Sequence, residues 1–120
     1  LILIARKIIN YDSDAVKFKS DEQIDEIISF INSNLDKKLT VNDISNKFFI
    51  SRYYLMHRFK ECTGKTVYSY IQSKKLLKAL NNINNGMSSK QACYESGFSD
   101  YSVFLKAFKK EFGAAPSRLK

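Results

Sequence analysis

The chain has 120 residues, of which 44% are hydrophobic, four are glycine and one is proline. This composition argues against a disordered chain and favours an all-α domain. Residues 1–46 hold six Lys and Arg against eight Asp and Glu, whereas residues 47–120 hold fourteen against four. The basic second part predicts an acidic partner, either nucleic acid or an anionic membrane surface, with charge that serves solubility alone as the alternative.

Residues 1–19 begin with the apolar stretch LILIARKII and continue with polar residues that show no clear period. Charges inside the apolar stretch and the lack of a small-residue cleavage site argue against a signal peptide. Because the chain also lacks an initial Met, we expect residues 1–19 to be the remnant of a missing upstream domain or a linker. The alternative is an amphipathic arm that packs on the rest of the chain or pairs two copies.

The first helix is expected directly after Ser20. The spacing Ser20-x-x-Gln23 predicts a capping box, and the acidic residues of the first turn suit the positive end of the helix dipole. Apolar residues then recur at helical spacing and predict one buried face, formed by Ile24, Ile27, Ile28, Ile31 and Leu35. The polar stretch NLDKK ends this helix.

A second, short helix is expected to begin at Thr40 and to turn two side chains inward, those of Ile44 and Phe48. A turn at Phe49 and Ile50 leads to Ser51, which is a favourable N-cap for a third helix. Gly64 ends that helix, since glycine adopts the left-handed conformation found after helix ends.

A longer connecting helix is predicted from about Thr66 to Ile83, and the stretch NNGMSS ends it. Its inward residues are expected to be Val67, Tyr70, Ile71, Leu76, Ala79, Leu80 and Ile83.

The two cysteines are far apart in the sequence and match no metal or redox spacing. Cys62 falls on a core face and Cys93 in a slot lined by small residues, so we expect both to be buried, reduced thiols.

The second half of the chain repeats the first. Ser88 with Gln91 predicts the cap of a short helix, a turn follows at Gly97, and Asp100 predicts the cap of the next helix. A shift of 49 positions superimposes four pairs, namely Ser51 on Asp100, Phe59 on Phe108, Lys60 on Lys109 and Gly64 on Gly113. Two copies of a short helix, a tight turn and a longer helix therefore flank the connecting helix.

Such a pair of helices is typical of the helix-turn-helix unit, whose second helix contacts base edges in the major groove. In the third helix the predicted buried face is Leu55, Phe59 and Cys62, and the predicted outward face is Arg52, Tyr53, Met56, His57 and Lys60. In the later copy the predicted buried residues are Phe104, Ala107 and Phe108, and the outward ones are Tyr101, Ser102, Leu105, Lys106 and Lys109. Donors, aromatic groups and flanking cations on one face suit base edges, thymine methyl groups and phosphates. One amphipathic helix is more often scaffold, but two copies in register favour DNA binding.

Residues 20–120 resemble the DNA-binding domain of the AraC/XylS transcription regulators. The resemblance is carried by GFSDYSVFLKAFKKEFGAAPSRLK and, in the first copy, by ISRYYLMHRFKECTGKT followed by YI and KLLKAL. It implies seven helices in two subdomains, residues 20–64 and 85–120, joined by a long connecting helix at 65–84. The implied base-contacting residues are Tyr53, Met56 and His57 in the first subdomain and Tyr101, Ser102, Leu105 and Lys106 in the second. The candidate phosphate contacts are Arg52, Lys60, Lys65, Lys90 and Lys109.

Three positions depart from the family pattern. Phe49 stands at the first turn in place of a small or polar residue, and Lys75 stands in the connecting helix in place of a common arginine. The helix SKQACYES before Gly97 is poor in apolar residues. We therefore expect the second subdomain to be less firmly packed, or to order fully only on DNA.

The predicted function is sequence-specific binding of double-stranded DNA for transcription regulation in the bacterial cytoplasm. The resemblance further implies activation at promoters, RNA polymerase as a candidate second partner, and an effector-sensing upstream domain that this chain lacks. No catalytic group, cofactor or metal is expected, because no acid, serine or cysteine is placed to make His57 a catalytic base. We expect His57 instead to contact a base or a phosphate and to bind more tightly when charged.

Two other classes remain open. A helical protein-interaction module would use the basic half as a docking face for acidic proteins. A peripheral membrane binder would need its bulky apolar residues and its cations on one long helix, whereas here they are divided between short capped helices.

Overall fold

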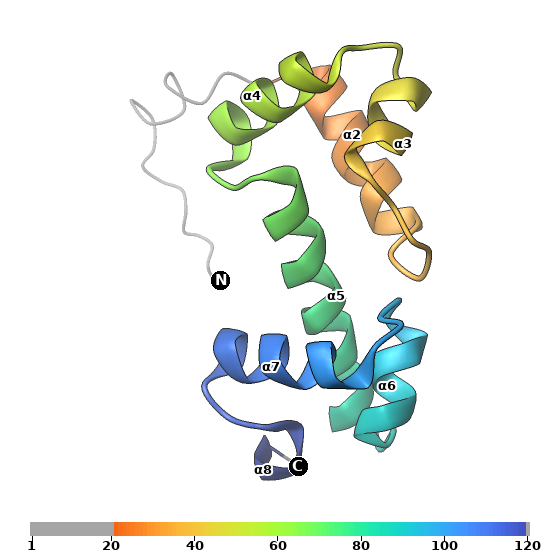
Figure 1. The fold of residues 1–120 in the computed structure, drawn as a ribbon, viewed down its shortest axis with the longest axis vertical. Coiled ribbons are helices and arrows are strands. Elements are labelled where there is room, and N and C mark those ends of the chain that lie inside the picture. The colour runs from red at the N-terminus through yellow and green to blue at the C-terminus, as the bar shows by residue number, and fades with distance from the viewer. Residues whose placement is uncertain (1–20, 120) are drawn as a thin grey trace.

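The computed structural model describes residues 21–119, apart from the side chains of Arg118 and Leu119. The predictions for residues 1–19 lie outside the described residues. The described chain forms helices and connecting turns, which confirms the all-α class (Figure 1). The helices are α2 (Glu22–Ser33), α3 (Val41–Lys47), α4 (Arg52–Thr63), α5 (Val67–Asn84), α6 (Ser89–Glu95), α7 (Tyr101–Phe112) and the single turn α8 (Pro116–Leu119).

Helices α3 to α7 begin where the sequence predicts. In each one the side-chain oxygen of the N-cap accepts a hydrogen bond from a backbone N–H of the first turn, and these caps are Thr40, Ser51, Thr66, Ser88 and Asp100. Gly64 and Gly113 end α4 and α7 in the left-handed conformation, with φ of 80° and 81°. The matched caps and terminal glycines of the two copies are thus confirmed.

The start of α2 differs from the prediction, because Asp21 rather than Ser20 is the N-cap. One carboxylate oxygen of Asp21 accepts hydrogen bonds from the N–H groups of Gln23 and Ile24, at 3.0 and 3.1 Å. The other accepts one from Nε of Arg58 on α4, at 2.6 Å. A carboxylate can cap α2 and bind α4 at the same time, whereas a serine hydroxyl offers only one oxygen.

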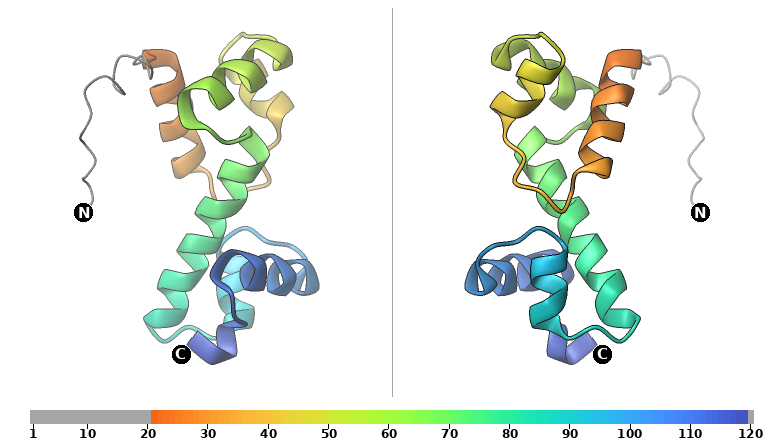
Figure 2. Two further views of the ribbon diagram at one scale, coloured as in Figure 1. Left: turned by 90° about the vertical axis from the view of Figure 1, so that its left-hand side faces the viewer. Right: turned by 90° about the vertical axis from the view of Figure 1, so that its right-hand side faces the viewer.

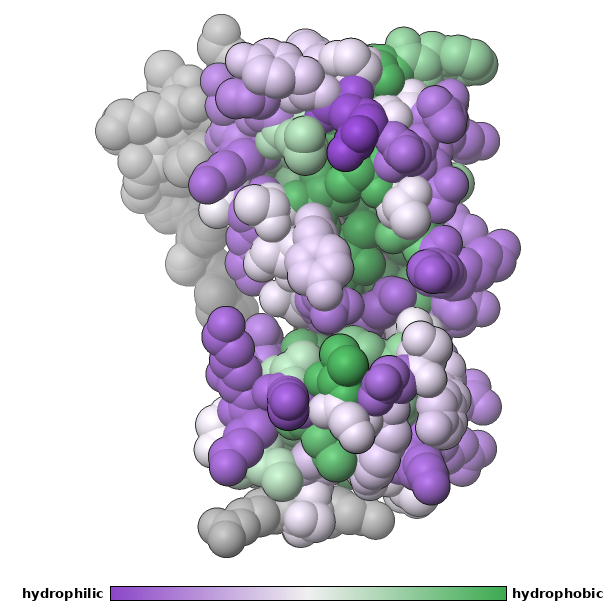
Figure 3. Space-filling view, viewed as in Figure 1, coloured by the Kyte–Doolittle hydropathy of each residue, from purple (hydrophilic) through white to green (hydrophobic). Residues whose placement is uncertain are grey.

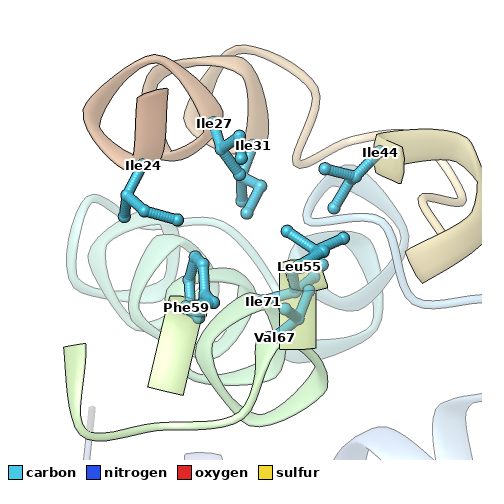
Figure 4. Close-up of a cluster of buried hydrophobic side chains, with 8 residues drawn as sticks. All are labelled: Ile24, Ile27, Ile31, Ile44, Leu55, Phe59, Val67 and Ile71. Atoms are coloured by element: carbon cyan, nitrogen blue, oxygen red, sulfur yellow. The ribbon is translucent and has the colours of Figure 1, made fainter. Parts of the chain in front are cut away.

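The first hydrophobic core lies where α2, α3 and α4 meet the start of α5 (Figure 4). Its buried residues are Ile24, Ile27, Ile31, Ile44, Leu55, Phe59, Val67 and Ile71. Ile28 and Leu35 pack against it half-buried, so the predicted face of α2 is confirmed. The ring of Phe30 meets that of Phe48 edge to face, which closes the core near α3. We call residues 21–71, which surround this core, the first unit.

The second hydrophobic core is formed by α6 and α7 against the remainder of α5. Its buried residues are Leu76, Ala79, Ile83, Ala92, Cys93, Phe98, Phe104 and Phe108. Helix α6 contributes only the small side chains of Ala92 and Cys93, so the larger buried side chains come from α5, from the α6–α7 turn and from α7. The thiol of Cys93 is buried and that of Cys62 half-buried, and both are free. We call residues 76–117 the second unit; its looser packing stays a prediction.

Helix α5 runs between the two units along the long axis of the molecule (Figure 1). In that view α4 and α7 lie towards opposite ends of α5 and cross the picture in the same direction. The side views of Figure 2 place α2 on one side of the molecule and α7 on the other, with α4 on the α7 side of α2. Helix α4 therefore lies nearer than α2 to the side of the molecule on which α7 lies. Within residues 21–119, no helix is both long and apolar enough to cross a bilayer.

Candidate DNA-binding surface

The outward face of α4 is arranged as the sequence predicts. Leu55 and Phe59 are fully buried on its inner side, while its outer side exposes Arg52, Tyr53, Met56, His57 and Lys60. The side chain of Tyr53 is 69% exposed, and its ring centroid lies 4.0 Å from that of His57. This face offers hydrogen-bond donors and a flat aromatic surface between two cations, a combination that suits base edges flanked by phosphates.

The outward face of α7 is narrower than predicted. Ser102, Lys106 and Lys109 are exposed, but Tyr101 and Leu105 are half-buried and pack against the second core. The hydroxyl of Tyr101 is hydrogen-bonded to that of Ser89 on α6 at 2.7 Å, and its ring stacks on Phe104. These two contacts hold Tyr101 against α6, since a partly buried tyrosine usually has a hydrogen-bonding partner for its hydroxyl and an aromatic neighbour for its ring.

Two exposed residues were missed by the sequence reasoning. Val103, one residue beyond Ser102, is 51% exposed, and Tyr68 at the start of α5 is 69% exposed. An exposed valine on a capped helix gives no signal in the sequence, since the same residue type usually marks a core. Tyr68 follows the buried Val67 by one position, so the helical period could have placed it outward.

These residues border two adjoining grooves. A groove of about 500 Å³ lies beside α4, and its lining includes Met56, His57 and Lys60 of α4 together with Tyr68 of α5. A second groove, of about 490 Å³, runs from Tyr68 to Val103 at the start of α7. Val41, Val67 and Tyr68 line both grooves, so one continuous surface runs from the exposed face of α4 to Val103 at the start of α7. In the view of Figure 3, hydrophobic residues lie in the middle of each half of the molecule, with hydrophilic residues around them.

The candidate phosphate contacts fall into two groups. Arg52, Lys60 and Lys109 are exposed on α4 and α7 themselves, and Lys90 is exposed near the start of α6, with Nζ 5.8 Å from the ring centroid of Tyr101. Lys65 is also exposed, but it borders a different groove, beside Lys74 and Glu111. Of the five candidates, Lys60 alone lines one of the two grooves that Tyr68 lines.

Within residues 21–117, the cations of the exposed faces have no acidic partner. Among the side chains that the structure describes, ion pairs join Arg58 to Asp21 and to Glu61, and none involves a cation of the outward faces of α4 and α7. Such uncompensated positive charge on one side of a domain attracts the phosphate backbone of nucleic acids.

Comparison with known proteins agrees with this geometry. The sequence profile of the family described as "Helix-turn-helix domain" matches residues 44–120. An uncharacterized response regulatory protein of Staphylococcus epidermidis is 33% identical over 97 residues, which make up 81% of this chain and 39% of that protein. The chain thus spans well under half the length of this curated relative.

Two solved structures share the fold. One is a transcriptional regulator of Chromobacterium violaceum with an AraC-type DNA-binding domain, at a TM-score of 0.75 and 23% identity over 82% of this chain and 88% of that one. The other is the DNA-binding domain of AdpA in complex with a target DNA, at a TM-score of 0.76 and 19% identity over 82% and 89%. The family is one of DNA-binding domains, in keeping with a non-enzymatic role. The resemblance found in the sequence is confirmed, and the chain belongs to the helix-turn-helix family of DNA-binding domains carried by AraC-type transcription regulators.

Proposed function

We propose that this DNA-binding domain places α4 and α7 in two successive major-groove segments on one side of a single duplex. The observation that carries this proposal is the continuous surface that runs from the exposed face of α4 to Val103 at the start of α7. The 18 residues of α5 span roughly 27 Å at 1.5 Å per residue. The widths of the two units add to this length, and the distance between α4 and α7 then comes near the ~34 Å of one DNA turn.

Within this arrangement, base edges are contacted by Tyr53, Met56 and His57 on α4. On α7 we propose Ser102 and Lys106 as the main base-contacting residues, with Val103 against a thymine methyl group. Tyr101 and Leu105 reach the DNA only with their exposed edges, because the rest of each side chain packs on the second core. Tyr68 lies between the two helices and faces the backbone that separates the two groove segments.

Phosphates are contacted by Arg52 and Lys60 from α4, and by Lys109 and Lys90 from the second unit. These contacts position the domain and make binding depend on salt, without selecting a sequence. Lys65 is the weakest candidate of the five, since it borders the groove on the other side of α5. It stays in the proposal as a contact to flanking DNA.

The domain acts as the DNA-binding part of a larger bacterial regulator in the cytoplasm. Support comes from the curated relative named a response regulatory protein, of which the matched region is 39%. An upstream domain would then sense the signal, and RNA polymerase would be the second partner at activated promoters. Activation rather than repression rests on the resemblance of the sequence to the family.

Selection of binding sites from random duplex DNA, followed by titration at several salt concentrations, tests the proposed function. We expect a consensus of two parts separated by about one helical turn, bound at least about 10³-fold more tightly than random duplex. Affinity should also fall steeply as salt rises. Recovery of no consensus, together with binding to acidic proteins, would favour the interaction module instead.

Three alanine variants test the roles of the two faces. Lys106→Ala and Tyr53→Ala should each weaken the selected site by about 1–3 kcal/mol and relax the choice of particular base pairs. Lys109→Ala should weaken binding to selected and random duplexes alike and reduce the salt slope by about one. Equal losses on both duplexes for all three variants would contradict the assignment of the faces.

A further inference from the structure

Lys75 is a buried lysine at the boundary between the two units. It lies on α5 between Ile71, which belongs to the first core, and Leu76, which belongs to the second. Lys75 is only 8% exposed, and burial lowers the pKa of its ammonium group. Lysine is seldom buried to this extent without a specific partner, so its contacts call for an explanation.

The partner of Lys75 is the turn between α6 and α7. Its Nζ donates a hydrogen bond to the carbonyl oxygen of Gly97 at 3.2 Å, and it lies 5.9 Å from the ring centroid of Phe98. The side chain therefore reaches from the middle of α5 to the turn that orients α7. A charged donor to a carbonyl is among the stronger hydrogen bonds of a protein when it is shielded from water.

Gly97 in turn contacts the first unit. A Cβ on Gly97 would overlap the carbonyl oxygen of Leu35 and lie 3.3 Å from the Cα of Asp36. Leu35 and Asp36 belong to the loop between α2 and α3, so the α6–α7 turn packs backbone to backbone on the first unit. The same Cβ would lie 3.2 Å from Cε of Lys75, so three parts of the chain meet at this point.

The corresponding turn of the first unit makes no such contact. Phe49 stands 48 positions before Gly97, also has a positive φ of 56°, and is 94% exposed. Both turns thus need the left-handed conformation, but only Gly97 also needs the absence of a side chain. The close contact at Gly97 therefore holds the two units against each other, and the turn itself does not require it.

We infer that Lys75, Gly97 and the Leu35 carbonyl form a clasp that fixes the relative position of α4 and α7, and with it the spacing of DNA segments that the domain accepts. The inference rests on the proposed binding of two groove segments. Lys75 is a positioning residue in this account, because it acts on the DNA only through the turn that holds α7. Without the clasp, the second unit would turn about the middle of α5 and accept other spacings.

The first test compares duplexes that differ only in spacing. One duplex carries the selected two-part site, and the others have one base pair inserted or removed between its parts, which shifts one part by about 3.4 Å and rotates it by about a tenth of a turn. Wild type should lose about tenfold or more in affinity on each altered duplex. Lys75→Met, which keeps the apolar stem without the donor, should bind the selected site several-fold more weakly and discriminate the altered spacings by less than about threefold.

Two variants control for the loss of charge and for the loss of the hydrogen-bond donor. Lys78→Met removes the same charge from the same helix and should discriminate spacing as wild type does. Lys75→Arg keeps a donor for the Gly97 carbonyl and should restore the discrimination. If Lys75→Met folds too poorly to bind, Gly97→Ala tests the same contact from its other side.

A measurement without DNA separates this inference from the proposed function. Backbone residual dipolar couplings of α4 and α7 should fit one common orientation in wild type and in Lys78→Met, but two independent ones in Lys75→Met. One common orientation in Lys75→Met, with unchanged spacing discrimination, would overturn the clasp while two-part DNA binding still stood. Absence of any selected site in wild type would overturn the proposed function, and the couplings would still decide the question of the clasp.

Discussion

The two units share one scaffold but differ in what they expose. Helices α4 and α7 each have 12 residues, begin at a capping side chain and end at a left-handed glycine. On α4 the outward positions are filled by exposed Tyr53, Met56 and His57. On α7 the residues 49 positions later are Ser102, the half-buried Leu105, and Lys106. The two units thus share their caps and inward phenylalanines but differ at the exposed positions, so the base contacts that we propose differ between the two helices.

The units also differ in how they are held to their surroundings. The first unit has an ion pair between Arg58 and Asp21, and the residue 49 positions after Arg58 is Ala107. The second unit instead contacts the rest of the molecule through Lys75 and Gly97. The first unit is therefore stabilised by an ion pair within it. The second unit is held against the first by a buried hydrogen bond and a close backbone contact.

The largest effect is expected from emptying either core. Phe59→Ala and Phe108→Ala should each cost about 3–5 kcal/mol of unfolding free energy, because both rings are fully buried. Since the two cores are separate, Phe108→Ala should lower the hydrogen-exchange protection of α6 and α7 far more than that of α2 and α4. Phe59→Ala should do the reverse. Equal loss of protection throughout residues 21–119 in both variants would show that the units do not have independent cores.

A smaller effect is expected at the two turns. Gly97→Ala should cost about 2–4 kcal/mol, because alanine is strained at positive φ and its Cβ overlaps the Leu35 carbonyl. The matched variant Phe49→Ala keeps a Cβ at a position that is already occupied by one, and it removes a ring that is 94% exposed. Chemical denaturation should show almost no change for Phe49→Ala, and a similar loss for both variants would contradict the contrast between the turns.

Asp21→Asn should lower the melting temperature by a few degrees at most. Asparagine still caps α2, but it cannot form the ion pair with Arg58. The hydrogen bond from Arg58 is the main cause that lowers the pKa of Asp21 in the folded protein. A carboxylate with a lowered pKa stabilises the fold above its unfolded pKa, and this stabilisation is lost as the pH falls through the folded pKa.

The difference between wild type and Asp21→Asn should therefore be full at pH 7 and shrink below about pH 4. Thermal unfolding from pH 7 to pH 3 measures it. The Arg58→Met variant and the double variant show whether the difference arises from the pair. A difference that grows as the pH falls would contradict the assignment.

The smallest effect is a gain. Phe49→Gly should raise the unfolding free energy by about 0.5–1 kcal/mol, because glycine adopts the left-handed conformation without the strain that phenylalanine bears there. The exposed ring contributes no packing that would be lost. Chemical denaturation of this variant checks the sign, and a loss of stability would mean that the Phe49 ring packs on its neighbours.

The scaffold was predictable because its signals are local. N-caps, terminal glycines and apolar spacing each act within a few residues, so the starts and ends of α3 to α7 follow from the sequence. Four features depend on residues distant in the sequence and were not predictable. Asp21 binds Arg58 of α4 in addition to capping α2, and Tyr101 turns inward towards Ser89. Gly97 must lack a side chain because Leu35 packs on it, and Tyr68 joins the two grooves.

The central claim is that both units contact one duplex in successive major-groove segments. Methylation of guanine N7, an atom in the major groove, interferes with binding wherever a protein side chain approaches that base. On the selected site, the account predicts two clusters of interference about 10 base pairs apart on the same side of the DNA. Lys106→Ala should remove guanines from one cluster only and Tyr53→Ala from the other only. A single cluster, or two clusters that lose the same guanines in both variants, would contradict the account.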